Sequence, residues 1–178
     1  TLISIGLVSE DGRKFYGECY DYDKEQINTW LQENVINHTT YLSEVSKTDI
    51  MSVDLDNMYL VSTKYGLKNY LSTWFEQFDS VELVSDVCHY DMVLLVDLFG
   101  TAFDLPENVS PVCHDINQDI ARVVGCTSAE AFDKSREELI GNLGVKAIEA
   151  EISSTAKHNA LYDAYVIRML YSLLNKTK

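Results

Sequence analysis

The sequence of 178 residues lacks several features that would place it in a class of protein at once. No apolar run approaches the roughly 18 to 20 residues that a membrane-spanning helix needs, and the first residues do not resemble a signal peptide. We therefore expect no membrane association and a cytoplasmic location. The four cysteines are widely spaced and form no Cys-x-x-Cys motif. This spacing favours reduced, mostly buried thiols over a disulfide framework.

Basic residues are scarce, because 14 lysines and arginines stand against 28 aspartates and glutamates, giving a formal net charge of −14. This balance argues against a broad basic surface that would wrap a long nucleic acid. It leaves open an active site in which carboxylates hold divalent cations, since such cations bind a few phosphates locally. Solubility alone is the other explanation of the charge.

Hydrophobic patterning predicts a mixed α/β fold in one domain over residues 1–178. Two β-rich runs flank Ser9–Gly12, whose turn chemistry predicts an opening β-hairpin. Residues 38–67 carry few helical or strand signals and are expected to form an irregular insertion. The other expected elements are strands at 81–88 and 109–113 and helices starting near Asp23 and spanning 68–78, 90–99, 115–124, 129–143 and 158–175.

The last predicted helix carries a carboxylate within its apolar stripe. The i, i+3, i+4, i+7 spacing places six residues on one side: Ala160, Ala164, Ile167, Leu170, Tyr171 and Leu174. Asp163 falls inside this stripe, whereas Tyr165 and Arg168 take the opposite, solvated side. A carboxylate packed against a core costs several kcal/mol unless a cation or metal pairs with it. His158, just upstream, adds a titratable group at the same end of the helix.

Asp91 stands in a similar place, just after Tyr90 at the junction between a predicted strand and an apolar helix. Leu94 and Leu98 follow it on the same helical face, while Asp97 points to the other side and is expected to be solvated. Two carboxylates and a histidine at the mouths of apolar helices are donors from which a Mg²⁺ or Mn²⁺ site is built. A helix cap is the other explanation of Asp91, because a first-turn aspartate is stabilised by free N–H groups.

Three segments together resemble the DEDDh exonucleases, a DnaQ-like and RNase T-like group within the RNase H-like fold. Leu2–Gly12 is similar to a strand and hairpin of the family, and Val81–Gly100 resembles its second motif. His158 and Asp163 match the third motif. The likeness is closest to the small single-domain branch that includes mycobacterial 3′–5′ exoribonucleases. The histidine subclass is favoured, because the tyrosine subclass would carry a tyrosine where this chain has Asn159.

The resemblance implies an RNase H-like mixed sheet flanked by helices and a two-metal hydrolysis of phosphodiester bonds. Asp91 and Asp163 would help to hold two Mg²⁺ or Mn²⁺ ions, and His158 would take the proton from the attacking water. A homodimer is a further implication of the resemblance.

The family's first motif, Asp-x-Glu on its first central strand, is absent from this chain. The sequence starts at Thr1, already inside the strand that follows that motif, so we expect the motif upstream in the full protein. Glu10, Asp11 and Glu18 are not expected to replace it, because they lie at the far turn or along the next strand.

Two other patterns allow more than one explanation. Cys88-His89 and Cys113-His114 could suggest zinc, but their spacing matches no common finger, which favours buried thiols beside structural histidines. Tyr90, Asn159 and Tyr162 lie beside the acids and are candidate substrate contacts, with tyrosine able to stack on a base. The tyrosines fit core or rim positions equally well.

The leading hypothesis is a metal-dependent 3′–5′ exonuclease acting on RNA or short single-stranded nucleic acid, since an acidic surface disfavours gripping long duplexes. A catalytically inactive RNase H-like module that binds protein or nucleotide is the alternative. An enzyme that processes mononucleotides would use the same metal chemistry and also stays open.

Overall fold

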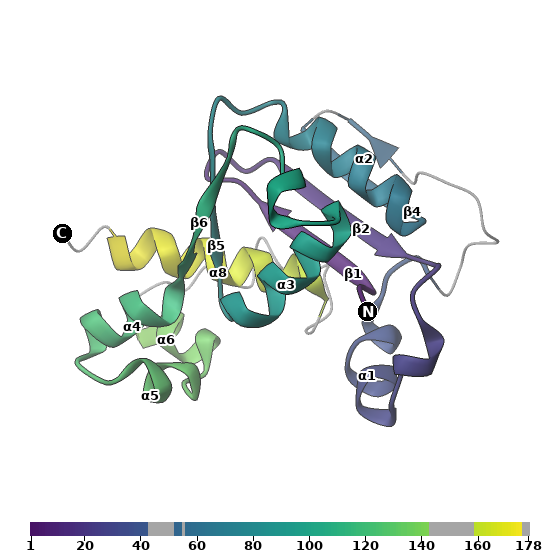
Figure 1. Cartoon of the computed structure of the whole chain (residues 1–178). Helices are drawn as coiled ribbons and strands as arrows, with labels where there is room; N and C mark the ends of the chain where they lie inside the picture. Colours follow the sequence, from purple (N-terminus) through teal and green to yellow (C-terminus); the bar gives the residue numbers. More distant parts are fainter. Residues whose placement is uncertain (43–51, 55, 143–158, 176–178) are drawn as a thin grey trace.

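A computed structural model describes residues 1–42, 52–54, 56–142 and 159–175 and shows a mixed α/β fold (Figure 1). Two small sheets are flanked by helices. One sheet has four strands in the order β1-β2-β4-β3, and the other pairs β5 with β6. The α/β class predicted from the sequence is confirmed. Among the helices of these described ranges, none is long and apolar enough to cross a membrane.

The expected β-hairpin opens the chain. Strands β1 (Ser4–Val8) and β2 (Lys14–Cys19) pair antiparallel, with Ile5 opposite Gly17. Gly12 in the turn has a φ of 96°, a conformation that favours glycine because it has no Cβ. The turn is closed by the Ser9 amide, which donates to the Arg13 carbonyl at 2.9 Å.

The prediction that residues 38–67 are irregular was wrong for their second half. Strand β4 (Asn57–Ser62) pairs parallel with β2 over its whole length, and the short β3 (Ser52–Val53) pairs with β4. Helix α2 (Lys64–Phe75) then starts after Thr63, whose hydroxyl accepts from the Gly66 amide at 3.1 Å. β4 escapes sequence analysis because its hydrogen-bond partner β2 is far away in the chain.

Helix α2 covers β2 and β4 and closes the first hydrophobic core. The core joins this helix to the first sheet and to α3, a helix described next. Its buried residues are Leu2, Phe15, Cys19, Met58, Leu60, Leu67, Leu71, Trp74, Phe75, Leu95, Leu98, Phe99 and Val109.

A strand-helix-strand unit follows, as expected. Strand β5 (Val81–Ser85) leads into helix α3 (Cys88–Phe99) and then, past the 3₁₀ turn η3 (Ala102–Asp104), into β6 (Val109–Asp115). β5 and β6 are parallel, with Ser85 opposite Asp115 at their carboxyl ends. The unit therefore brings the end of each strand and the start of α3 to one place.

Three short helices come next. α4 (Ile116–Val124) agrees with the prediction, but the helix expected over 129–143 is divided into α5 (Ser128–Phe132) and α6 (Arg136–Asn142). α5 ends at a C-cap residue, Asp133. Arg136 explains the break, because its guanidinium donates to the carbonyls of Ala131 and Lys134 at 2.7 and 2.8 Å, and these carbonyls close the end of α5.

The helix expected after Asp23 is much shorter than predicted. Asp23 caps the 3₁₀ turn η1 (Lys24–Gln26), and α1 (Thr29–Asn34) starts only after Asn28. Trp30, which was expected on an apolar face, is 62% exposed. A second 3₁₀ turn, η2 (Ile36–His38), follows directly.

The last helix, α8 (Ala160–Asn175), packs against β1 and β5 and against α4 and α6. Because these elements surround α8 on more than one side, its buried residues are not confined to the one helix face that the sequence predicted. Tyr165, expected on the solvated side, is buried together with Leu161, Val166, Leu170 and Leu174. They contribute to the second core, whose other buried members are Tyr16, Ile116, Ile120, Ala131 and Ile140.

Candidate functional site

Asp91 lies in the first turn of α3, as the sequence predicts, and its side chain is held by the preceding strand. The hydroxyl of Ser85, the last residue of β5, donates to one of its carboxylate oxygens. Asp91 is exposed, so the expectation that it stands against the apolar face of its helix was wrong. Its N–H already donates to the Val87 carbonyl at 3.1 Å. Ser85 thus leaves the other carboxylate oxygen of Asp91 accessible for a ligand.

Two further acids, Asp86 and Asp115, lie at the carboxyl ends of β5 and β6. The sequence analysis did not single them out. Asp86 follows β5, and one of its oxygens accepts from two nitrogens of Arg136 at 2.6 and 2.9 Å. Asn117 joins the same group, because it donates to the Asp86 carbonyl at 2.6 Å and accepts from Arg136 at 2.7 Å. Asp115 at the end of β6 caps α4 through the Asn117 amide at 2.9 Å. The carboxyl ends of parallel strands are where α/β folds place their sites.

The two thiols of the Cys-His pairs meet beside Asp91. The sulfur atoms of Cys88 and Cys113 are 3.2 Å apart, and both thiols are reduced. Burial, and then the hydrogen bond between the Cys113 thiol and Cys88, raise the pKa of Cys113 to about 12. Their histidines do not join them, because His114 turns to Asp119 at 2.6 Å and packs edge-on against Tyr171. His114 therefore has the structural role that was expected, but Cys88 and Cys113 are only half-buried, so the prediction of buried thiols was wrong for this pair.

Asp163 lies in the first turn of α8, but it does not press against the core. The structure shows it exposed, so the argument that burial alone demands a cation beside it was wrong. The side of α8 that packs into the core carries Leu161, Tyr165 and Val166 near this end of the helix. Asp163 lies on a part of the helix surface that the core does not cover. The Asp163 carboxylate therefore remains accessible to solvent and to a ligand.

Of the other predicted site residues, Asn159 and Tyr162 lie at the start of α8. His158 falls outside the described residues. Asn159 is buried, with its side-chain oxygen accepting from the Leu161 amide at 2.9 Å. Tyr162 is half-buried and its hydroxyl lies 3.5 Å from a carboxylate oxygen of Glu137. Tyr90, by contrast, is 68% exposed on α3.

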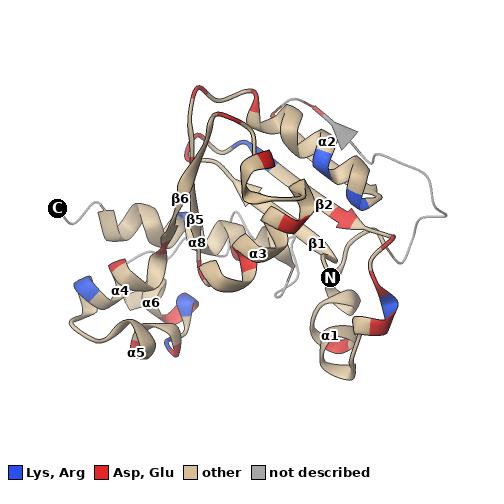
Figure 2. Ribbon diagram, viewed as in Figure 1, with Lys and Arg blue, Asp and Glu red and all other residues tan. Residues whose placement is uncertain are grey.

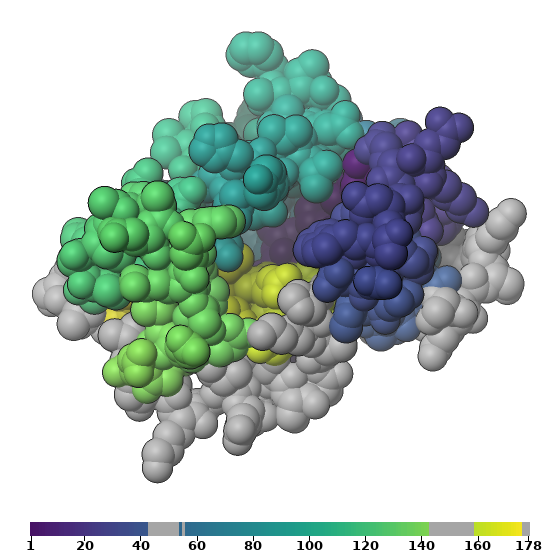
Figure 3. All heavy atoms as spheres, turned by 90° about the horizontal axis from the view of Figure 1, so that it is seen from below, coloured from purple at the N-terminus to yellow at the C-terminus, as the bar shows by residue number. Residues whose placement is uncertain are grey.

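The helices that carry Asp91 and Asp163 border one hollow of the surface. Both α3 and α8 pack against β5. Figure 3 shows α8 in yellow on the floor of a hollow, with α3 above it and with α4–α6 and α1 on either side. The structure thus brings together the two helices that the sequence marked separately.

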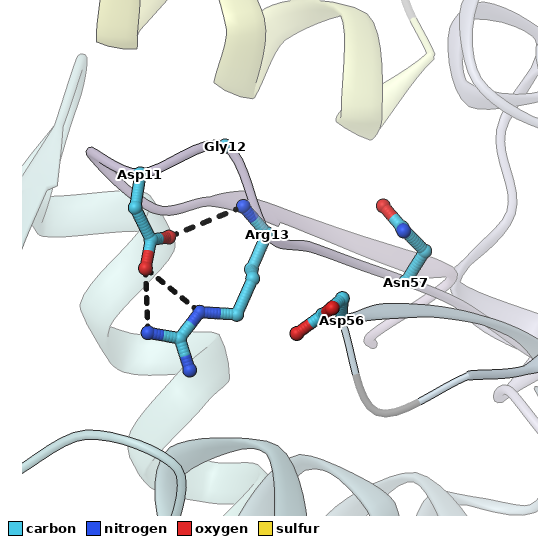
Figure 4. A pocket seen from close by; sticks show the side chains of 5 residues that line it. All are labelled: Asp11, Gly12, Arg13, Asp56 and Asn57. Atoms are coloured by element: carbon cyan, nitrogen blue, oxygen red, sulfur yellow. Dashed lines mark hydrogen bonds and ion pairs between the residues drawn. The ribbon is translucent and has the colours of Figure 1, made fainter.

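A second hollow, of about 400 Å³, lies away from these acids at the turn of the β1–β2 hairpin (Figure 4). Two of the residues that line it, Asp11 and Arg13, form an ion pair. Two nitrogens of Arg13 donate to Asp11 at 2.5 and 2.9 Å. This pair keeps the pKa of Asp11 well below its usual range. The guanidinium also lies 4.2 Å from the centre of the Phe78 ring. We interpret the hollow as a stabilised turn rather than as the site.

The charge distribution agrees with a site for cations rather than for polyanions. Figure 2 shows acidic residues on most elements and basic residues in a few separate places. In the described ranges, no three His, Cys, Asp or Glu side chains gather closely enough to hold a metal ion. Asp91 and Asp163 are exposed carboxylates, but these ranges do not gather the further side chains that a metal site of three or more ligands needs.

Comparison with known proteins adds one distant relationship. No protein-family model matches the chain. Over 117 residues it is 29% identical to a protein named 3′–5′ exoribonuclease from Mycobacterium tuberculosis, with the same values in two strains. The chain is similar to an exoribonuclease. The match covers 66% of this chain and 62% of the length of each relative.

Proposed function

We propose that this protein is a 3′–5′ exoribonuclease of the DEDDh type with an RNase H-like fold. The observation that carries the proposal is the pair of accessible first-turn aspartates, Asp91 on α3 and Asp163 on α8, on two helices packed against β5. The distant similarity to a mycobacterial 3′–5′ exoribonuclease supports it.

Asp91 and Asp163 would hold the metal ions, which we propose are two Mg²⁺ or Mn²⁺. Hard oxygen donors of this kind suit these ions, and one oxygen of Asp91 is already oriented by Ser85. The acids of the family's first motif would complete the set. When bound, the ions would stabilise charge on the attacking and leaving oxygens.

His158 would act as the general base in this proposal. A neutral imidazole accepts the proton of the attacking water, and the reference pKa of histidine, about 6.5, suits that duty near neutral pH. The proton leaves water as the new phosphorus–oxygen bond forms, and the 3′ oxygen of the penultimate nucleotide departs. The products are a mononucleotide and a strand that is one nucleotide shorter.

Substrate contacts are proposed for Tyr90 and Tyr162, and an indirect effect on the substrate is proposed for Asn159. Tyr90 is exposed next to Asp91, where its ring is free to stack on a base. Tyr162 stands one residue before Asp163. Asn159 faces inward, so its influence on the substrate would pass through the start of α8. Single-stranded RNA or a short oligonucleotide is the substrate that fits a formal net charge of −14, and a homodimer is the proposed assembly.

The test uses the full encoded protein and a single-stranded RNA labelled at its 5′ end. We expect nucleotides to be removed one at a time from the 3′ end with Mn²⁺ or Mg²⁺, and no removal with a chelator. His158→Ala should abolish the reaction while leaving the circular dichroism spectrum unchanged. Full metal-dependent activity in that variant would exclude the role of His158.

A binding module without catalysis is the second candidate, favoured by the lack of a three-ligand metal group within the described ranges. The two candidates differ in whether the full encoded protein carries the family's first motif. Its presence supports the nuclease, and its absence, together with RNA binding but no cleavage, supports the binding module.

A further inference from the structure

Glu18 is a carboxylate that is 0% exposed and hydrogen-bonded to Tyr16 of the second core, and no cation lies against it in the described part of the structure. Its oxygens accept from the amides of Thr40, Leu42 and Tyr41 at 2.5, 2.7 and 3.0 Å. Tyr16, two residues earlier on β2, donates its hydroxyl at 2.5 Å. A buried carboxylate is costly unless its hydrogen bonds are made, and here four donors meet that need.

The same hydroxyl leads to the start of α8. The side-chain nitrogen of Asn159 donates to the Tyr16 hydroxyl at 2.7 Å, and the side-chain oxygen of Asn159 accepts from the backbone amide of Leu161. The Asp163 amide donates to the Asn159 carbonyl at 3.1 Å. Burial, and then the charge of Glu18, raise the pKa of Tyr16 far above its usual value, so its phenol keeps the proton that it donates. A continuous hydrogen-bonded path therefore joins Glu18 to the first turn of α8.

We infer that Glu18, Tyr16 and Asn159 are positioning residues that fix the first turn of α8 and thereby the carboxylate of Asp163. The inference rests on the proposed function, in which Asp163 holds a metal. None of the three is proposed to touch the reacting atoms. Glu18 thus has a role that the position of the acid along β2 did not suggest, namely support of the site from inside the fold.

The rest of α8 does not perform this task. Leu161 is buried within the first turn, but the other buried residues of the helix, Tyr165, Val166, Leu170 and Leu174, all follow Asp163. Metal ligands must be held within about 0.5 Å of their productive position. A small shift of the first turn would therefore impair catalysis while the body of the helix stays packed.

Tyr16→Phe tests the path, because phenylalanine fills the same space and removes only the hydroxyl. Tyr70→Phe is the matched control, since Tyr70 is partly buried against the first core, on α2. In the full encoded protein we expect Tyr16→Phe to lower kcat about 10- to 100-fold, with KM for RNA within about twofold. The Mn²⁺ concentration needed for half-maximal rate should rise several-fold. The control should keep all three values.

Asn159→Asp distinguishes two effects of the Asn159 side chain, namely capping of the α8 amides and its hydrogen bond to Tyr16. Aspartate keeps an oxygen for the Leu161 amide and is a good N-cap, but it cannot donate to Tyr16. We expect this variant to lose kcat like Tyr16→Phe. We expect the double variant to lose less than the product of the two single losses, because both break one path. Full activity in Asn159→Asp would show that only capping matters and would overturn the inference.

Hydrogen exchange gives a readout that does not depend on activity. Amides at the start of α8, including Leu161 and Asp163, should exchange at least about tenfold faster in Tyr16→Phe than in wild type, with later turns unchanged. Unchanged exchange there would overturn the inference. If wild-type protein released no nucleotide, the proposed function would fail, while exchange would still decide whether the path holds the helix start.

Discussion

Gly6 of β1 lies directly against the backbone of α8 at Leu161. A Cβ added at Gly6 would stand 2.5 Å from the Leu161 amide nitrogen and would also overlap the carbonyl group of Ala160. These are main-chain atoms, which cannot turn away as a side chain does. The absence of a side chain at Gly6 therefore allows the first sheet and the start of α8 to meet.

Gly6→Ala should consequently displace the first turn of α8. Overpacking of this kind costs about 1 to 3 kcal/mol, and we expect that loss in the free energy of unfolding measured with urea. Any nuclease activity should fall as well. Gly141→Ala in α6 is the control, because no atom lies within 4 Å of its added Cβ. It should stabilise the protein by about 0.5 to 1 kcal/mol.

Asp91→Asn should remove metal-dependent activity by at least about 100-fold, since an amide is a poorer ligand for Mg²⁺ than a carboxylate. Asp97→Asn, on the same helix, is the control. Asp97 is exposed and pairs with Lys64 at the surface, where such pairs contribute at most about 1 kcal/mol. Equal rates of nucleotide release in the Asp91 variant and wild type would remove Asp91 from the site.

The Asp119 carboxylate should make stability depend on acid pH. Burial opposes its charge, but hydrogen bonds from Arg122 and His114 outweigh this and hold its pKa below the ordinary 3.8. A lowered folded-state pKa stabilises the fold above the unfolded-state value, and this contribution disappears as pH falls through the folded value. Asp119→Asn should therefore lower the midpoint of thermal unfolding at pH 7. The difference should shrink below pH 3.8.

Cys113 should react slowly with iodoacetamide. Its pKa of about 12 leaves almost no thiolate at pH 8, and the thiolate is the nucleophile. Cys126, which is also partly accessible, is the internal comparison. Mass spectrometry of tryptic peptides after timed labelling should find Cys126 modified first. Faster labelling of Cys113 would contradict the burial and hydrogen bonding that raise its pKa.

Local signals were predicted correctly where the cause lies in neighbouring residues. The hairpin follows from Ser9–Gly12, whose glycine takes the positive φ that the turn requires. α3 follows from an apolar run of helical length and ends at Gly100, again with positive φ. β4 was missed because its partner is β2, and α1 was overextended because Asp23 caps a 3₁₀ turn instead.

In the candidate site, too, some features were predicted from neighbouring residues and others depend on residues distant in the chain. Asp91 was placed at the start of its helix from the sequence, and that position was correct. Asp163 was expected about one turn inside the last helix, but it lies in the first turn of α8. Their burial was wrong, because periodicity states which residues share a helix face but not which part of that face another element covers. Ser85, Arg136 and Glu18 carried no signal, since each acts through a residue brought close only by folding.

The sequence by itself determined the acid-rich composition, the opening hairpin, the β5-α3-β6 unit, and the presence of aspartates near the starts of α3 and α8. These properties depend on composition and on residues within a turn or two of one another. Only the tertiary structure decided that β2 pairs with β4 and that α8 is buried from several sides. It also decided that Glu18 is linked to Asn159 through Tyr16. The hydrogen bond between Tyr16 and Asn159 joins residues 143 positions apart. Contacts of that range depend on how the elements pack in space, which no local pattern specifies.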